Sequence, residues 1–534
     1  MKLHAALAEF LRSAGVDSLF GLIGDGNLFF VDSYVREHGG RYVSVAHETA
    51  AVLAALGFAR VSGRVGVATV THGPALTNTV TALIEGARAR LPIVLIAGDT
   101  ARIDESNLQN VPQRAVAAVA EAPFVEIRSA DTWQSDVRRA FRIAAVESRP
   151  VVLNVPIELM WADVAIPTAT GSEVSRFAPP PPREQDLDDA LGIIGSSRRP
   201  LVLAGRGGIE AREQLIRLAE LLGAPLATTL GAKDLFRGML ADVGVFGGLS
   251  SDAGVQAIAA SDCVIAFGAS LNGFTTEHDT LLKGKRVVVC DVDASRARSD
   301  IPGAVLVGGD AAEVARAMCD LIEEAEILPT TFRAGLAAID GGEPAASGAA
   351  DTTLDIMAAY RAMDELLPPE HILVTDGGRF LPLAWKSLHI EHPRKLVPTI
   401  HFGSIGLGMG YAIGAAAAAP DTPVTLVTGD GGHMLGGYAE FTTAIRHGLD
   451  ITVIVMNDGG YGAEWVQFEA RGMDPKLSLL PWPEFAAVAE AAGAQAFSVA
   501  SVDALRSALT TVRAPGPRLI DIRLDPAAIP NALH

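Results

Sequence analysis

Residues 429–464 have the sequence GDGGHMLGGYAEFTTAIRHGLDITVIVMNDGGYGAE, in which two similar turns, GDGG and NDGG, are one helix-length apart. Each turn directly follows an apolar run, at 423–428 and 451–456, and this order predicts a strand, a helix and a second strand. A right-handed crossover places both turns at the carboxyl edge of a parallel sheet, where open α/β sheets bind ligands. We therefore expect Asp430 and Asp458 to lie close together.

The segment between the two turns is predicted to be a helix over 433–448. Four apolar residues recur in it at helical spacing: Leu435, Tyr438, Phe441 and Ile445. We expect this apolar face to pack on the sheet. The N-terminus of the helix should point to the same edge as the turns, where it adds capacity to bind an anion.

Two carboxylates held close together repel each other unless a cation lies between them. Oxygen ligands suit Mg²⁺ or Ca²⁺, and Mg²⁺ usually shares its coordination sphere with a phosphate. The alternative is that Asp-Gly-Gly is simply a favourable turn sequence. For one turn we would prefer that alternative, but two turns at paired strand ends favour a metal–diphosphate site.

Short apolar runs alternate with helical stretches along the whole chain, which is typical of βαβ units and parallel sheets. Residues 168–184, with four consecutive prolines, and residues 338–353 lack this pattern, and we interpret both segments as linkers. They separate three doubly wound α/β domains with parallel sheets. We place the domains at 1–165, 186–335 and 352–534.

The expected strands are apolar runs between turn residues. They are SLFGLI, YVSVA, VGVATV, PIVLIAG and PVVLNVP in the first domain, PLVLAG, CVIAFG and RVVVCD in the second, and ILVTD, PVTLVTGD, ITVIVMND and RLIDIRL in the third. In the second domain, Gly205-Arg206-Gly207-Gly208 follows a strand without the GxGxxG spacing. We therefore interpret it as a structural turn and not as a dinucleotide site.

Composition narrows the class of protein. The chain has 534 residues, 49% of them hydrophobic, and a formal net charge of −19. This charge argues against a nonspecific surface for nucleic acid or an anionic membrane. The apolar runs are too short to span a bilayer, and three cysteines do not form a disulfide framework. We expect a soluble, cytoplasmic protein.

The order GDG, helix, strand and N-[ND]-x-G resembles the cofactor motif of thiamine diphosphate (ThDP) enzymes, the group of acetolactate synthase, pyruvate decarboxylase, benzoylformate decarboxylase and benzaldehyde lyase. The resemblance covers nearly the whole chain and implies a ThDP-binding fold with pyrimidine-binding, middle and diphosphate-binding domains in that order. It implies that Asp430, the Asp458 side chain and the Gly460 carbonyl bind Mg²⁺. Gly431 and Gly432 then lie beside the diphosphate.

Three features of the diphosphate region depart from this family's pattern. Asp458 stands where most relatives have Asn, so we expect tighter metal binding and less favourable diphosphate binding. The segment GGHMLGG has one extra residue, which should alter the start of the helix. TDGGRF (375–380) resembles the other diphosphate loop and contributes Gly377, Gly378 and Arg379. Relatives often have Gln at this position. Arg379 either offsets the charge of Asp458 or is solvated.

Glu48, in YVSVAHETAAVLAALGFAR, opens a helix after a strand. A glutamate in the first helical turn is also favoured by the helix dipole alone. The resemblance implies a chemical role, in which the carboxyl group hydrogen-bonds the aminopyrimidine of ThDP and promotes the imino tautomer that removes the C2 proton.

Two further segments resemble cofactor contacts of the same family. THGPALTN (71–78) places Pro74 and Asn78 near the pyrimidine. HFGSIGLGMG (401–410) places Gly403 at the 4′-amino group and Ile405 under the bent cofactor. The alternative for the second segment is a glycine-rich helix start packed on the sheet.

Four side chains are candidates for acid–base and orienting roles: Asp25, His72, Gln109 and Glu464. Asp25 in GDGNL and Glu464 in NDGGYGAE resemble catalytic acids of pyruvate decarboxylase. His72 matches an active-site histidine of benzoylformate decarboxylase. Gln109 resembles the active-site glutamine of acetolactate synthase and benzaldehyde lyase, while the paired histidines of pyruvate decarboxylase are absent. For each of the four, the alternative is an ordinary loop residue.

The resemblance implies a ThDP- and Mg²⁺-dependent lyase or decarboxylase, with carboligase capacity, that acts on a 2-oxo acid, aldehyde or acyloin. The alternatives are an acetolactate synthase-like carboligase and a non-catalytic homologue that binds the cofactor. Bound FAD is disfavoured, because GASLNGF (268–274) lacks the arginine of FAD-binding relatives. The family places the cofactor between subunits, so a homodimer or tetramer is expected.

Overall fold

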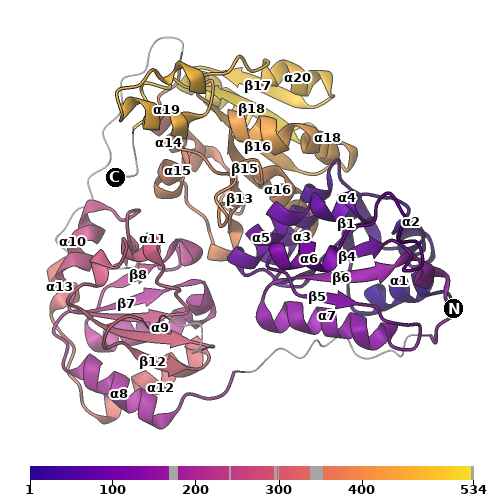
Figure 1. Cartoon of the computed structure of the whole chain (residues 1–534). Helices are drawn as coiled ribbons and strands as arrows, with labels where there is room; N and C mark the ends of the chain where they lie inside the picture. Colours follow the sequence, from indigo (N-terminus) through magenta and orange to yellow (C-terminus); the bar gives the residue numbers. More distant parts are fainter. Residues whose placement is uncertain (167–178, 240–241, 294–297, 299, 337–352, 531–534) are drawn as a thin grey trace. The chain divides into compact units, whose positions relative to one another are not determined.

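The computed structural model describes residues 1–166, 179–239, 242–293, 298, 300–336 and 353–530, and it contains three six-stranded parallel sheets with interleaved helices (Figure 1). Apolar side chains pack on both faces of these sheets. In the N-terminal sheet, Leu95 belongs to one core and its neighbours Val94 and Ile96 to another. The predicted fold class is therefore confirmed.

The N-terminal sheet has the strand order β2-β1-β3-β4-β6-β5. Its strands are β1 (Ser18–Gly21), β2 (Arg41–Ser44), β3 (Gly66–Val70), β4 (Ile93–Asp99), β5 (Phe124–Glu126) and β6 (Pro150–Pro156). Its helices are α1 (Leu3–Ser13), α2 (Leu28–Asp32), η1 (Ser33–Glu37), α3 (Glu48–Ser62), α4 (Pro74–Thr77), α5 (Val80–Ala89), α6 (Gln113–Val119), α7 (Trp133–Glu147) and η2 (Ile157–Trp161).

The middle sheet has the order β12-β11-β10-β7-β8-β9, which is that of dinucleotide-type folds. Its strands are β7 (Pro200–Ala204), β8 (Leu226–Thr228), β9 (Asp242–Val245), β10 (Cys263–Phe267), β11 (Arg286–Asp291) and β12 (Val305–Gly308). Its helices are α8 (Glu184–Gly195), η3 (Arg206–Ala211), α9 (Arg212–Leu222), η4 (Leu230–Ala232), α10 (Asp252–Ala260), α11 (Gly273–Thr276), η5 (Thr280–Leu282), α12 (Ala311–Glu324) and α13 (Phe332–Leu336). Gly205 and Gly207 pack directly on the backbone of Gly268, as expected for a structural turn.

The C-terminal sheet has the order β14-β13-β15-β16-β18-β17, which repeats the topology of the N-terminal sheet. Its strands are β13 (Ile372–Thr375), β14 (Leu396–Pro398), β15 (Val424–Gly429), β16 (Ile451–Asn457), β17 (Gln495–Val499) and β18 (Arg518–Arg523). The helical elements of this part of the chain are α14 (Ile356–Leu366), α15 (Leu381–Ser387), η6 (Pro393–Lys395), α16 (Gly408–Ala418), α17 (Asp430–Gly432), η7 (His433–Gly437), α18 (Tyr438–Arg446), α19 (Gly462–Glu469), η8 (Pro475–Ser478), α20 (Phe485–Ala491) and α21 (Val502–Thr510).

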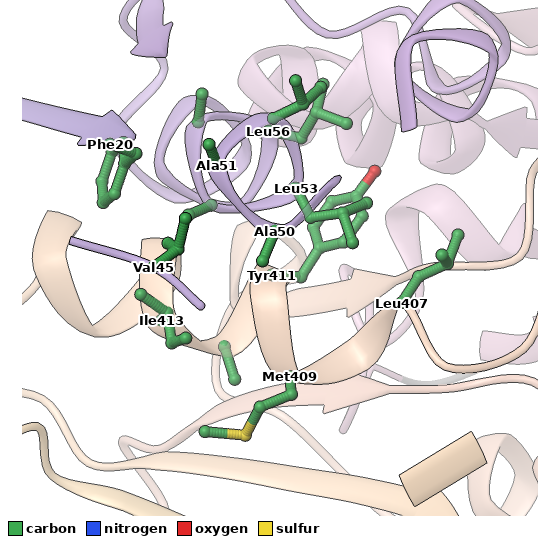
Figure 2. Close-up of a cluster of buried hydrophobic side chains, with 14 of the residues drawn as sticks. Phe20, Val45, Ala50, Ala51, Leu53, Leu56, Leu407, Met409, Tyr411 and Ile413 are labelled. Atoms are coloured by element: carbon green, nitrogen blue, oxygen red, sulfur yellow. The ribbon is translucent and has the colours of Figure 1, made fainter. Parts of the chain in front are cut away.

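The chain forms two compact units, of which the first contains the N- and C-terminal sheets and the second contains the middle sheet. Within the first unit, α3 packs against α16. Figure 2 shows Ala50 and Leu53 of α3 beside Tyr411 of α16 in one buried cluster. Glycines permit this close approach, because a Cβ on Gly414 would collide with the Ala54 carbonyl.

The helix between the two Asp-Gly-Gly turns differs from the prediction. It begins with α17, continues through the π-helical turn η7 and becomes regular only at α18. Phe441 is buried, but Leu435 and Tyr438 are exposed, so the predicted apolar face is wrong in its first half. A π turn holds one residue more than an α turn, which rotates the residues before it relative to α18.

Neither predicted linker can be compared fully with the structure, because residues 167–178 and 337–352 lie outside the described residues. Among the described helices, none is long and apolar enough to cross a membrane.

Candidate active site

Three Asp-Gly-Gly turns end three adjacent strands of the C-terminal sheet. Asp376 follows β13, Asp430 follows β15 and Asp458 follows β16. The strands are parallel, so all three turns lie at one edge of the sheet. The predicted convergence of Asp430 and Asp458 is therefore found.

Asp430 and Asp458 form a pair of buried carboxylates. Burial, followed by the charge of Asp458, raises the pKa of Asp430 to about 7. Burial also raises the pKa of Asp458. Trp482 Nε1 donates to Asp430 Oδ2 at 2.8 Å, and the Gly460 carbonyl lies 3.8 Å from where a Cβ on Gly431 would stand. The three predicted metal-binding residues thus occupy one small region.

Arg379 is paired with Asp458 and is not solvated. Its Nε donates to Asp458 Oδ2 at 2.8 Å, its Nη2 donates to the Pro526 carbonyl, and the side chains of Arg379 and Asp458 are only 9% and 8% exposed. Gly462, at the start of α19, packs directly on this ion pair. Glu464 follows two residues later on the exposed side of α19.

Asp376 organises the loops around this edge. It accepts hydrogen bonds from Gly377 N at 2.8 Å, Gly406 N at 3.0 Å and Thr428 Oγ1 at 3.1 Å. Its burial is complete and raises its pKa. A side chain on Gly432 would collide with Asp376 Oδ2, which explains the glycine there.

The segment 401–406 runs beside the same edge. Gly403 has a φ of +83°, a conformation that favours glycine, and Ile405 approaches Gly377. Gly378 also has a positive φ, of 155°. The structure thus brings the predicted cofactor-binding residues of the C-terminal domain together.

In the N-terminal domain, Glu48 begins α3 at the carboxyl end of β2. Its carboxylate accepts a hydrogen bond from Asn78 Nδ2 at 3.0 Å. Pro74 and Asn78 are both exposed and belong to the loop and short helix after β3. Of the three residues of this domain predicted to meet the pyrimidine, Glu48 and Asn78 are therefore in direct contact, and Pro74 is on the same loop as Asn78.

Asp25, His72 and Gln109 lie on three loops that pack together at the carboxyl edge of the N-terminal sheet. Gly26 N donates to Thr71 Oγ1 at 2.9 Å, and a Cβ on Gly26 would stand 2.8 Å from His72 Nδ1. The Gln109 carbonyl packs against Gly73, whose φ is +62°. His72 is buried, whereas Asp25 is exposed. In the described part of the chain, these three side chains make no hydrogen bond to the C-terminal domain.

Three protein-family models match successive parts of the chain. They are described as the N-terminal TPP binding domain, the central domain and the C-terminal TPP binding domain of thiamine pyrophosphate enzymes, and they match residues 1–120, 187–318 and 376–522. The chain belongs to the thiamine pyrophosphate (thiamine diphosphate) enzyme family. The resemblance seen in the sequence is confirmed, and the chain is an enzyme of this family.

Several relatives of this ThDP enzyme align over most of its length. It is 28% identical to a sulfoacetaldehyde acetyltransferase of Rhodobacter capsulatus, over 95% of this chain and 91% of the relative. It is also 28% identical to an acetolactate synthase of Mycobacterium bovis, over 86% of this chain and 76% of the relative. An acetolactate synthase large subunit of Parasynechococcus marenigrum is 28% identical, over 97% of this chain and 87% of the relative.

The donor set at the C-terminal edge of the ThDP enzyme fits Mg²⁺ with a diphosphate. Within the described residues, no three His, Cys, Asp or Glu side chains form a metal site, so a cation between Asp430 and Asp458 needs other oxygens. A backbone carbonyl and phosphate oxygens are the partners that Mg²⁺ usually takes. Such a cation would relieve the repulsion from Asp458, which adds to burial in raising the pKa of Asp430.

The prediction from sequence did not identify Asp376, Trp482 or Glu85, the last of which accepts hydrogen bonds from His401 N and Phe402 N. Asp376 was available as a third Asp-Gly-Gly turn, in TDGG. Trp482 and the partners of the segment 401–406 had no local signal, because they are distant in sequence from the motifs they contact.

Proposed function

We propose that this chain is a ThDP- and Mg²⁺-dependent enzyme that cleaves and forms carbon–carbon bonds next to the carbonyl group of 2-oxo acids or acyloins. The observation that supports it most is the buried pair Asp430 and Asp458, at the ends of adjacent strands in the domain matched by the C-terminal TPP binding model. When bound, ThDP supplies a nucleophilic carbon that adds to a carbonyl group.

In this proposal, the C-terminal domain holds the diphosphate end of the cofactor. Asp430, Asp458 and the Gly460 carbonyl bind Mg²⁺, and the turns 377–379 and 431–432 lie along the diphosphate. Gly403 and Ile405 contact the middle of the cofactor, since Ile405 lies next to Gly377 and Gly403 is two residues before it in the same segment.

The N-terminal domain contributes the groups that act on the pyrimidine and the substrate. Glu48, held by Asn78, hydrogen-bonds the pyrimidine ring and moves its proton. His72, Asp25 and Gln109 orient or protonate the substrate, because their loops pack together at one sheet edge. Glu464 acts as a further acid from the start of α19.

We propose that a second copy of the chain completes the cofactor site. Large apolar side chains are exposed at both sheet edges: Ile103 and Leu108 near Gln109, and Leu435 and Leu477 near the Asp-Gly-Gly turns. Exposed apolar side chains at both edges are compatible with burial against another chain. We propose a homodimer or tetramer with the cofactor between subunits.

A second candidate function is transfer of the acyl-derived unit to another acceptor. Relatives named acetolactate synthase and sulfoacetaldehyde acetyltransferase over nearly the whole chain favour it, and Gln109 is compatible with it. The two candidates differ in product, since protonation releases an aldehyde and a second carbonyl gives a hydroxyketone.

The test is product NMR with ThDP and Mg²⁺ and a panel of pyruvate, phenylglyoxylate, benzoin and sulfoacetaldehyde. We expect CO₂ or aldehyde from at least one 2-oxo acid or acyloin. A hydroxyketone or acyl product without free aldehyde would favour the second candidate. If the protein binds ThDP but turns over no substrate of the panel, both candidates fail for these substrates and a non-catalytic role in cofactor binding is favoured.

The matched variant is Glu48→Gln, which keeps the shape of the side chain and removes its acid–base function. We expect turnover to fall by about 100-fold or more while ThDP still binds. Turnover equal to that of the wild type would contradict the role of Glu48.

A further inference from the structure

Glu440 is a buried carboxylate of α18 that binds the backbone of the N-terminal domain. Its Oε1 accepts hydrogen bonds from Ala46 N at 3.1 Å and His47 N at 2.9 Å. Its Oε2 accepts one from Thr443 Oγ1 at 2.8 Å and also lies 3.2 Å from Ala46 N, which is shared between the two oxygens. Ala46 and His47 are the two residues before Glu48. Glu440 therefore fixes the start of α3, from which the Glu48 side chain projects.

Glu85 makes the reciprocal contact from the N-terminal domain. It is fully buried in α5, and its Oε2 accepts a hydrogen bond from Phe402 N at 2.6 Å. Its Oε1 accepts from His401 N at 3.2 Å and lies 2.8 Å from His401 Nδ1. His401 and Phe402 directly precede Gly403, so Glu85 fixes the start of the segment that approaches Gly377.

The two contacts are equivalent in the repeated topology of the two domains. Glu85 is in a helix that follows the third strand of its sheet, β3, and Glu440 is in the helix that follows the third strand of the other, β15. Each carboxylate accepts two consecutive N–H groups from the loop after the second strand, β2 or β14. The helices that begin after these loops, α3 and α16, pack on each other (Figure 2).

Burial of a carboxylate costs free energy unless it is well hydrogen-bonded, and apolar packing would be less costly for joining two domains. The same arrangement is nevertheless present twice. In each case the two bonded residues directly precede a residue of the proposed cofactor site.

We propose that Glu85 and Glu440 are positioning residues, each holding in place the segment that the other domain contributes to the cofactor. This inference rests on the proposed function. Glu440 acts through Glu48, so it controls activation of the cofactor. Glu85 acts through the segment 401–405, so it controls binding of the cofactor.

The two carboxylates differ in what a glutamine can replace. In Glu440→Gln, an amide oxygen at the Oε1 position keeps both backbone N–H groups, because Ala46 N and His47 N both bond Oε1. The amide nitrogen then takes the Oε2 position, where it donates to the Thr443 hydroxyl, which rotates to accept, and only the weaker share of the Ala46 N–H is lost. In Glu85→Gln, both oxygen positions face a backbone N–H, so either orientation sets an amide N–H against a donor. The conservative change is thus tolerated at 440 and not at 85.

The experiment measures two quantities on the full-length protein with ThDP and Mg²⁺: the apparent affinity for ThDP, from tryptophan fluorescence, and the rate of hydrogen–deuterium exchange at C2 of bound ThDP, from NMR after acid quench. For Glu440→Ala we expect exchange to slow about 10-fold or more with affinity changed less than about 3-fold. Glu440→Gln should recover most of the exchange rate. Glu85→Gln should weaken ThDP binding about 10-fold or more.

The matched control is Asp262→Asn in the middle domain. Asp262 is another carboxylate that accepts backbone N–H groups, from Arg198 and Arg199. This variant should leave both the affinity for ThDP and the exchange rate unchanged. If Glu85→Gln does not accumulate as folded protein, the comparison of Glu440→Ala with Glu440→Gln decides the outcome. Wild-type exchange in Glu440→Ala, or equal loss in Glu440→Ala and Glu440→Gln, would overturn the inference. If the wild-type protein neither binds ThDP nor exchanges its C2 proton, the proposed function itself fails.

Discussion

The ion pair between Arg379 and Asp458 places a third charge beside Asp430. When Asp430 and Asp458 are both ionised, as they are with a bound cation, the three side chains have a net charge of −1. Arg379→Gln changes this net charge to −2 in a buried region. A buried carboxylate that loses its partner is strongly unfavourable, and extra negative charge opposes a diphosphate. We predict that Arg379→Gln lowers the apparent affinity for ThDP about 10-fold or more at fixed Mg²⁺, measured by tryptophan fluorescence.

The control for this prediction is the double variant Arg379→Gln with Asp458→Asn. It restores one net negative charge and still offers an amide oxygen at position 458, so we expect most of the affinity to return. The single variant Asp458→Asn completes the comparison. If the loss of affinity in the double variant equals the sum of the losses in the two single variants, the two residues do not compensate each other.

His433 lies in the π turn three residues after Asp430 and is buried against Phe441 and Phe485. Burial lowers the pKa of His433 to about 4, and among the described residues its Nδ1 has no hydrogen-bond partner. The unfolded chain, with an ordinary histidine pKa of about 6.5, binds the proton more readily, so stability is lost as the pH falls from that value toward 4. We predict that the free energy of unfolding of the apoprotein decreases by about 3 kcal/mol more between pH 7 and pH 4 in the wild type than in His433→Leu.

Urea denaturation followed by circular dichroism, at several pH values, measures this difference. Parallel pH dependences for the two proteins would show that His433 is not buried in its neutral form.

Residues near a motif were predictable because the motif fixes both their sequence position and their surroundings. Asp430, Asp458 and Gly460 converge since each terminates a parallel strand, and strand ends can be located from apolar runs. Glu85 and Glu440 could not be found in this way. Their partners are more than 300 positions away in the chain, and only the packing of one domain on another brings them together.

At the scale of elements, the contact between α3 and α16 depends on glycine. A Cβ on Gly414 would lie only 1.8 Å from the carbonyl oxygen of Ala54, and a Cβ on Gly57 only 2.1 Å from that of Tyr411. We predict that Gly414→Ala lowers the free energy of unfolding by about 1–3 kcal/mol or more, because the helices must separate. Differential scanning calorimetry measures the change.

The same substitution at Gly192 is the matched control. Gly192 is exposed within α8, and a Cβ there would meet nothing within 4 Å. Alanine should therefore stabilise the protein by about 0.4–1 kcal/mol. Equal effects at 414 and 192 would mean that the close approach of the two helices is not needed.

The elements that were predicted are the long, apolar and central ones. β4, β6, β15, β16 and β18 match their predicted positions closely, whereas six strands were missed: β5, β8, β9, β12, β14 and β17. Three of these, β5, β8 and β14, have only three residues, which are too few to show a pattern. The π turn was missed for a similar reason, since its extra residue shifts the helical phase and no single residue type marks it.

At the scale of the molecule, the repeated topology of the N- and C-terminal domains gives each a carboxyl edge with its own set of polar groups. Asp25, His72 and Gln109 belong to one edge, and Asp430, Asp458 and Arg379 belong to the other. Within the described residues of one chain, no hydrogen bond links these two sets. A second copy is the simplest way to place the two edges against each other.

This arrangement predicts the oligomeric state and its sensitivity to mutation. Leu108 and Leu435 are 99% and 64% exposed, and both follow the carboxyl end of a strand, β4 or β15. We predict that the wild type is at least a dimer by light scattering after size-exclusion chromatography. The double variant Leu108→Asp with Leu435→Asp should shift it toward the monomer, because burying two carboxylates at an interface is costly.

Val512→Asp is the control, because Val512 is 88% exposed but precedes β18, at the opposite edge of its sheet. A monomeric wild type that turns over substrate would contradict the shared site, as would an unchanged dimer in the double variant.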